Sequence, residues 1–125
     1  MKILLVDDEP SIVKMVGKRL EIAGFQVVVA MDGEEALQKA SSEKPDLIIL
    51  DFMLPKKNGY EVCSLLKKDQ RYQKIPVLLF TAKAAEEGEK IGAGCGADGY
   101  IRKPFQAQEF LDTIHGLIGK SKGSV

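Results

Sequence analysis

Five short apolar runs constrain the fold of this chain more than any other feature of its sequence. They are Ile3–Val6, Val27–Val29, Leu47–Leu50, Val77–Phe80 and the shorter Gly99–Ile101. None of the first four alternates with polar residues, as a strand with one solvated face would. A strand without that alternation suits a parallel sheet that is covered on both faces. The sequence therefore predicts a sheet of buried parallel strands.

Stretches with helical periodicity lie between and after these runs. They are predicted at Pro10 to Gly24, Glu34 to Ser42, Tyr60 to Lys68, Ala84 to Gly96 and Ala107 to Ile118. The third carries Val62, Leu65 and Leu66 in its apolar stripe, which predicts that these side chains are buried. The fourth is rich in glycine, which costs about 1 kcal/mol per residue against alanine, so we expect a short or weak helix there. Alternation of strands and helices predicts a doubly wound α/β domain with helices on both faces of the sheet.

Length and composition fit a single globular domain. We expect the domain to occupy residues 1–119, and the polar residues 120–125 to form a disordered tail or the start of a linker. The 18 basic and 18 acidic residues cancel, so the sequence predicts no direct nucleic-acid or membrane binding by this domain. No segment reaches membrane-spanning length, and the N-terminal run is too short for a signal peptide. These features predict a soluble cytoplasmic protein.

The chain has two cysteines, Cys63 and Cys95, without the paired spacing of a metal site. We expect both to be reduced thiols. Cys63 falls near the apolar face of the third predicted helix and is expected in the core. Cys95 lies between two glycines and is expected to be more exposed.

Residues with chemical function follow four of the five apolar runs. Asp7 and Asp8 follow the first, Asp51 the third, Thr81 the fourth and Lys103 the fifth. The carboxyl ends of strands in such a sheet meet at one edge, where ligands bind. Clustered carboxylates repel one another unless a cation joins them, and oxygen ligands with open positions suit Mg2+. An aspartate in such a site can act as a nucleophile toward a phosphoryl group.

Four sequence blocks resemble the signature of CheY-like response-regulator receiver domains, which belong to two-component signalling. The blocks are Leu4–Pro10, Ile48–Pro55 with Asn58–Gly59, Leu79–Ala82 and Gly96–Phe105. Their order matches the family, and the resemblance runs from about Lys2 to Gly119 of this chain. It implies a five-stranded parallel sheet in the flavodoxin-like order 2-1-3-4-5. It also implies a phosphoprotein of the phosphorelay type that is not an enzyme, beyond promoting its own phosphorylation and dephosphorylation.

The resemblance implies a role for each residue of the metal and phosphoryl site. Asp51 resembles the residue that accepts a phosphoryl group from a sensor histidine kinase or a phosphotransfer protein. Asp8 resembles a direct Mg2+ ligand and Asp7 the acid that holds metal-bound water. Asp51 and the backbone carbonyl of Met53 are similarly placed to complete the metal shell.

The resemblance also implies a switch. Thr81 and Lys103 resemble the pair that contacts the phosphoryl group, and Tyr100 the aromatic residue that turns inward when Thr81 moves. The surface formed by the fourth helix, fifth strand and last helix would then change and control a partner. The domain is expected as a monomer or a phosphorylation-dependent dimer. The last helix lacks the charged pairs typical of winged-helix transcription-factor receivers, so we assign no DNA-binding output.

Simpler interpretations stay open for individual residues. Asp7 and Asp8 could cap the first helix, since acids favour helix N-termini. Lys103 could be a solvated loop residue, and Thr81 and Tyr100 could be core residues. Two other functions also fit in part. A haloacid-dehalogenase-like phosphatase would need two acids, separated by one residue, after one strand; a docking module would act without phosphorylation.

Overall fold

The computed structural model describes residues 1–52, 54, 58–81, 94–102 and 106–122, apart from the side chains of Thr81 and of residues 120–122. The elements are β1 (Lys2–Val6), α1 (Pro10–Ile22), β2 (Gln26–Ala30), α2 (Gly33–Glu43), β3 (Leu47–Asp51), α3 (Gly59–Lys68), β4 (Val77–Thr81), β5 (Gly99–Arg102) and α5 (Ala107–Lys122).

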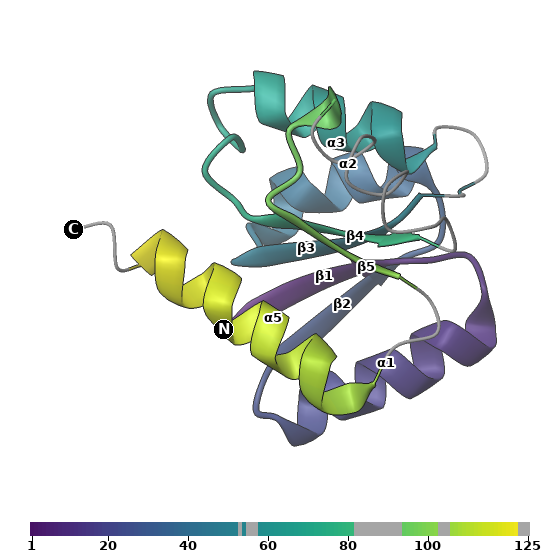
Figure 1. Ribbon diagram of the computed structural model, residues 1–125. Coiled ribbons are helices and arrows are strands. Elements are labelled where there is room, and N and C mark those ends of the chain that lie inside the picture. Colours follow the sequence, from purple (N-terminus) through teal and green to yellow (C-terminus); the bar gives the residue numbers. More distant parts are fainter. Residues whose placement is uncertain (53, 55–57, 82–93, 103–105, 123–125) are drawn as a thin grey trace.

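The strands form one parallel sheet in the order β2-β1-β3-β4-β5, which confirms the predicted fold. Helices α1 and α5 cover one face of the sheet, and α2 and α3 cover the other (Figure 1). Every residue of β3, the central strand, is buried: its four apolar residues, as predicted, and also Asp51 at its end. The apolar runs without polar alternation therefore arise because both faces of the sheet are packed.

Alternate residues of the strands divide between two cores. The core under α2 and α3 contains Leu4, Val6, Ile48, Leu50, Val77 and Leu79, with Ala36, Ala40, Val62, Cys63, Leu66 and Cys95. The core under α1 and α5 contains Ile3, Leu5, Leu47, Ile49, Leu78, Phe80 and Ile101, with Val16, Leu20, Phe110, Ile114 and Ile118. Successive side chains of a strand point to opposite faces, which produces this division.

Two expectations about burial were wrong. Leu65 is 47% exposed, because the buried stripe of α3 runs through Val62, Cys63 and Leu66; burial of Val62 and Leu66 agrees with the predicted stripe. Cys95 is buried, at 3% exposed, because the turn that carries it packs against α3. Of the predicted fourth helix, only the end at residues 94–96 lies within the described part, where Gly94 and Cys95 are helical.

Helix α5 continues to Lys122, beyond its predicted end at Ile118. It therefore includes residues 120–122, the first part of the segment for which we expect a disordered tail; residues 123–125 lie outside the described residues. Within the described part of the chain, no helix has both the length and the apolar character needed to cross a membrane.

Candidate functional site

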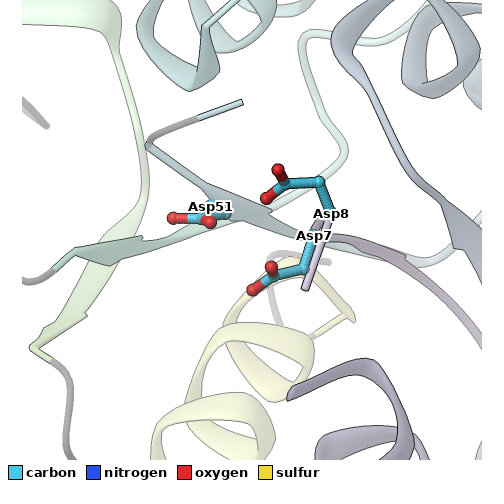
Figure 2. A group of neighbouring side chains, drawn as sticks. All are labelled: Asp7, Asp8 and Asp51. Atoms are coloured by element: carbon cyan, nitrogen blue, oxygen red, sulfur yellow. The ribbon is translucent and has the colours of Figure 1, made fainter. Parts of the chain in front are cut away.

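Three acidic residues meet at the carboxyl edge of the sheet. Asp7 and Asp8 follow directly after β1, and Asp51 is the last residue of β3. Because β1 and β3 are parallel neighbours with Val6 opposite Leu50, the residues that follow these two lie side by side. Carboxylate oxygens of the three acids lie within 4.8 Å of one another. Figure 2 shows the cluster, with two side chains from the end of β1 and one from β3.

The three acids differ in how the fold holds them. Asp7 is fully buried and Asp51 is 8% exposed, whereas Asp8 is exposed. The backbone N–H of Asp7 donates to the carbonyl oxygen of Ala30 at 3.1 Å, which ties the residue to the end of β2. Its Oδ1 accepts a hydrogen bond from the backbone N–H of Glu9 at 3.0 Å. Asp7 is therefore a fixed part of the site, and Asp8 is the acid most open to an incoming ion.

The capping interpretation of these two acids is not supported. The N-cap residue of α1 is Glu9, and its side chain makes no capping hydrogen bond. Pro10 occupies the first turn, where a missing N–H costs nothing. Asp7 and Asp8 precede the cap and lie beside Asp51 instead. Their position is explained better by the cluster than by the helix.

A glycine at the start of α3 brings that helix against the end of β3. A Cβ atom at Gly59 would lie 2.3 Å from the backbone oxygen of Asp51 and 2.8 Å from Cα of Phe52. The backbone N–H of Gly59 donates to the carbonyl oxygen of Phe52 at 2.9 Å. The side chain of Asn58 caps the helix by accepting from the N–H of Glu61 at 2.9 Å. Gly59 belongs to one of the four sequence blocks, but only the tertiary packing reveals this close approach.

The donor set fits a small hard cation. Three like charges within 4.8 Å repel by about 3 kcal/mol per pair at an effective dielectric near 20. Magnesium takes oxygen ligands at about 2.0–2.1 Å, which puts ligand oxygens roughly 3–4 Å apart in octahedral geometry. The carboxylate oxygens, which lie within 4.8 Å of one another, are close to that spacing. The exposed side of Asp8 leaves room for water ligands or a phosphoryl oxygen.

Of the other predicted site residues at this edge, only the backbone of Thr81 lies within the described part of the chain. Thr81 ends β4, where its backbone is paired with Arg102 of β5, and its neighbour Phe80 is opposite Asp51. The backbone of Thr81 therefore ends β4 at the edge that holds the acids. The side chain of Thr81, and all of Met53 and Lys103, lie outside the described residues.

Tyr100 lies on β5 and is half-buried. It packs against the core under α2 and α3. This placement agrees with the simpler interpretation of Tyr100 as a core residue, and it leaves the predicted switching role as a prediction.

A sheet of this order with an acidic cluster at its carboxyl edge defines the class of CheY-like α/β signalling domains. The model of the response regulator receiver domain matches residues 3–115. The chain belongs to this family, which confirms the resemblance drawn from the four sequence blocks. Receiver domains of this kind are signalling modules rather than enzymes, and the phosphatase alternative is not favoured.

Similar proteins support this assignment. The alkaline phosphatase synthesis transcriptional regulatory protein PhoP of Bacillus subtilis is 47% identical over 121 residues, which are 97% of this chain and 50% of that protein. The chain thus spans about half the length of this curated relative. The chemotaxis response regulator CheY4 of Vibrio cholerae superposes with a TM-score of 0.87 at 36% identity, covering 93% of this chain and 97% of CheY4.

A third similar structure contains a metal. The receiver domain of the sensor histidine kinase PA1611 from Pseudomonas aeruginosa has a TM-score of 0.87 at 27% identity, over 94% of this chain and 97% of that one. That structure has a magnesium ion coordinated in its active-site cleft.

Proposed function

We propose that this domain accepts a phosphoryl group on Asp51 in a site that also binds Mg2+. The observation that supports this most directly is the meeting of Asp7, Asp8 and Asp51 within 4.8 Å at the end of two neighbouring strands. Asp7 and Asp8 would hold the ion together with Asp51 and the carbonyl oxygen of Met53. The ion, when bound, offsets the charge of the acids and polarises a phosphoryl oxygen.

Asp51 is the acid suited to be the nucleophile. Its carboxylate oxygen attacks phosphorus while the bond from phosphorus to the donor breaks, and the electron pair of that bond leaves with the donor group. The product is an acyl phosphate on the side chain. The backbone of Asp51 is fixed by β3 and by the approach of Gly59, which keeps the carboxylate at the sheet edge. Lys103 and the Thr81 hydroxyl would contact the new phosphoryl oxygens.

The added group would act as a switch. A phosphoryl group brings about −1.5 to −2 charge to the edge of the sheet. Thr81 and Tyr100 lie on the paired strands β4 and β5, so a movement of Thr81 would be transmitted to Tyr100 over a short distance. The surface that includes β5 and α5 would then present a changed face to a partner.

The phosphodonor we propose is a sensor histidine kinase or a phosphotransfer protein in the cytoplasm. The Bacillus relative is named as a transcriptional regulatory protein. This supports a transcriptional output for a longer protein that carries the present domain, with nucleic acid contacted outside the receiver itself. The equal numbers of acidic and basic residues agree with a receiver that does not itself bind nucleic acid.

The proposal is tested by treating the purified chain with acetyl phosphate, with and without Mg2+, and measuring its intact mass. We expect one phosphoryl group to be added when Mg2+ is present, and little in the presence of EDTA. Asp51→Asn should stay unmodified. Asp112→Asn, which changes an exposed acid on α5 far along the chain from the cluster, should be modified like the parent. A phosphoryl group retained by Asp51→Asn would rule out Asp51 as the acceptor.

A further inference from the structure

The two cysteines of the chain lie together in the structure although they are 32 residues apart. Cys63 is on α3, and Cys95 is in the helical turn that precedes β5. The Sγ of Cys63 donates a hydrogen bond to the carbonyl oxygen of Cys95 at 3.5 Å, and the two side chains are close enough to shift each other's pKa. Neither cysteine is part of a disulfide, and the two residues are 0% and 3% exposed. The chain has no other cysteine, so each thiol has a single possible partner within the molecule.

One face of α3 brings the two thiols together. Tyr60, Cys63 and Lys67 follow one another at helical spacing along this face. A Cβ at Gly94 would lie 3.0 Å from the hydroxyl oxygen of Tyr60, and one at Gly96 would lie 3.4 Å from the side chain of Lys67. The glycines on either side of Cys95 thus let the backbone of the turn approach α3 closely.

An ion pair anchors the same contact next to the thiols. The Nζ of Lys67 lies 2.5 Å from Oδ2 of Asp98, and it also donates to the carbonyl oxygens of Gln73 and Ile75 at 3.1 and 2.8 Å. The carboxylate of Asp98 in turn accepts from the backbone N–H of Val77 at 2.8 Å. The end of α3, the start of β4 and the segment before β5 are therefore held in one network. Movement of Cys95 away from Cys63 would have to disturb it.

The surroundings give the two thiols different chemical characters. Interaction with the Cys63 thiol, a hydrogen bond with the backbone of Ala97 and the nearby positive charge of Lys67 lower the pKa of the Cys95 thiol. The same interaction between the two side chains, together with burial, raises the pKa of the Cys63 thiol. Cys95 is thus the more nucleophilic sulfur, and Cys63 is placed to react with whatever forms on it.

We propose that Cys63 and Cys95 are a reversible oxidation site that a peroxide converts to an intramolecular disulfide. The Cys95 thiolate attacks one oxygen of hydrogen peroxide, the O–O bond breaks, and the departing hydroxide takes up a proton to become water. Cys95 is then a sulfenic acid. The Cys63 sulfur attacks the Cys95 sulfur, the S–O bond breaks, and the leaving hydroxide takes the Cys63 proton as a second water. The protein loses two electrons and two protons, and the peroxide is reduced to two waters.

The disulfide would join α3 to the turn that leads into β5. A small oxidant is required, because both sulfurs are buried. Such a bond fits a reducing compartment as a transient modification rather than a structural one. The site uses none of the acids at the sheet edge, and the proposed oxidation does not depend on phosphorylation of Asp51.

The test uses the full chain, reduced and freed of reductant, then exposed to hydrogen peroxide under native conditions. The protein is next denatured, alkylated with iodoacetamide and digested for peptide mapping. We expect a cross-linked peptide that joins positions 63 and 95 in the monomer, with neither thiol alkylated. Dithiothreitol should restore both alkylation sites. A parent chain that keeps two alkylatable thiols, or that forms only intermolecular disulfides, would overturn the proposal.

Two variants separate the steps. Cys63→Ala should form no cross-link but should retain a sulfenic acid at Cys95 that dimedone labels. Cys95→Ala should keep Cys63 alkylatable after the same treatment. Dimedone labelling of Cys63 in the second variant, without labelling of Cys95 in the first, would reverse the assigned roles and contradict the mechanism. The presence or absence of the cross-link in the parent chain tests whether Cys63 and Cys95 form a disulfide, even if a variant does not fold.

Discussion

At the residue scale, the site combines one buried acid, one nearly buried acid and one exposed acid. Asp7 is held by hydrogen bonds to Ala30 and Glu9, so its carboxylate is part of the folded framework. Asp8 contributes charge without burial. Removing its charge should therefore change metal binding more than it changes the fold.

The first prediction concerns Asp8→Asn. The loss of one charged oxygen ligand should weaken Mg2+ binding by roughly tenfold or more, which is about 1.4 kcal/mol. Without metal, the variant should be slightly more stable than the parent, because repulsion between charges about 5 Å apart in water is on the order of 1 kcal/mol. The measurement is the melting temperature as a function of Mg2+ concentration, since a ligand bound only to the folded state stabilises it.

The matched control for this titration is Asp112→Asn on α5, which should respond to Mg2+ like the parent. An Asp8→Asn variant whose melting temperature rises with Mg2+ as steeply as that of the parent would show that Asp8 is not a ligand.

At the element scale, the junction of β3 and α3 sets the position of Asp51. The first residue of α3 lies so close to the end of β3 that only glycine fits there. The Asn58 cap and the hydrogen bond from Gly59 to Phe52 fix the helix in that place. The strand end and the helix start thus form one unit.

The second prediction follows from this contact. Gly59→Ala would place a methyl group 2.3 Å from the backbone oxygen of Asp51, so the backbone of one element must shift. We expect a loss of about 1–3 kcal/mol in the free energy of unfolding, the usual cost of overpacking, together with slower phosphorylation by acetyl phosphate. Urea unfolding monitored by circular dichroism gives the first quantity.

Gly116→Ala provides the control, because a Cβ at this position on α5 would meet no atom within 4 Å. Alanine is the better helix former by about 0.8–1 kcal/mol, so this variant should be more stable than the parent. Equal stability of the Gly59→Ala variant and the parent would contradict the account of the junction.

Most elements could be predicted from the sequence because their patterns are local. The apolar runs identify the strands, and Asp32 and Asn58 directly precede α2 and α3 as their N-caps. The exposure of Leu65 and the burial of Cys95 could not be predicted in this way. The exposure of Leu65 depends on the rotation of α3 about its own axis, and the burial of Cys95 depends on the packing of its segment against α3. The local spacing of residues determines neither.

At the scale of the whole molecule, two hydrophobic cores on opposite faces of one sheet both stabilise the fold. The core under α1 and α5 includes three residues of α5, of which Ile118 is the last. Phe110 of this helix packs against Phe80 of β4, with ring centroids 5.4 Å apart. The last helix is thus part of the domain as far as Ile118.

The third prediction tests the proposed domain limit at residue 119. A chain that ends at Gly119 should keep the parent's melting temperature within a few degrees, because it retains every α5 residue of the core. A chain that ends at Ile114 loses the buried Ile118 and the partly buried Leu117, and a fully buried aliphatic side chain is worth about 1.5–3 kcal/mol. Differential scanning calorimetry compares the two. A large loss of stability in the longer chain would move the limit toward Lys122.

The acidic cluster was predictable because it depends only on strand order. Once β1 and β3 are parallel neighbours, the residues that follow them must meet, whatever the details of packing. The contacts of Lys67 with Asp98 and of Cys63 with Cys95 were not predictable, because each joins side chains whose elements are not paired strands. Such contacts require the three-dimensional structure.

The central claim is that Asp51 carries the phosphoryl group at a magnesium site, and the most direct test identifies the modified residue in the unmutated protein. The chain is treated with acetyl phosphate and Mg2+, and the acyl phosphate is then reduced with sodium borohydride, which converts a phosphorylated aspartate to homoserine. Peptide sequencing by mass spectrometry should find homoserine at position 51 and at no other aspartate. Homoserine at position 7 or 8, or none at position 51 in a phosphorylated sample, would contradict the account.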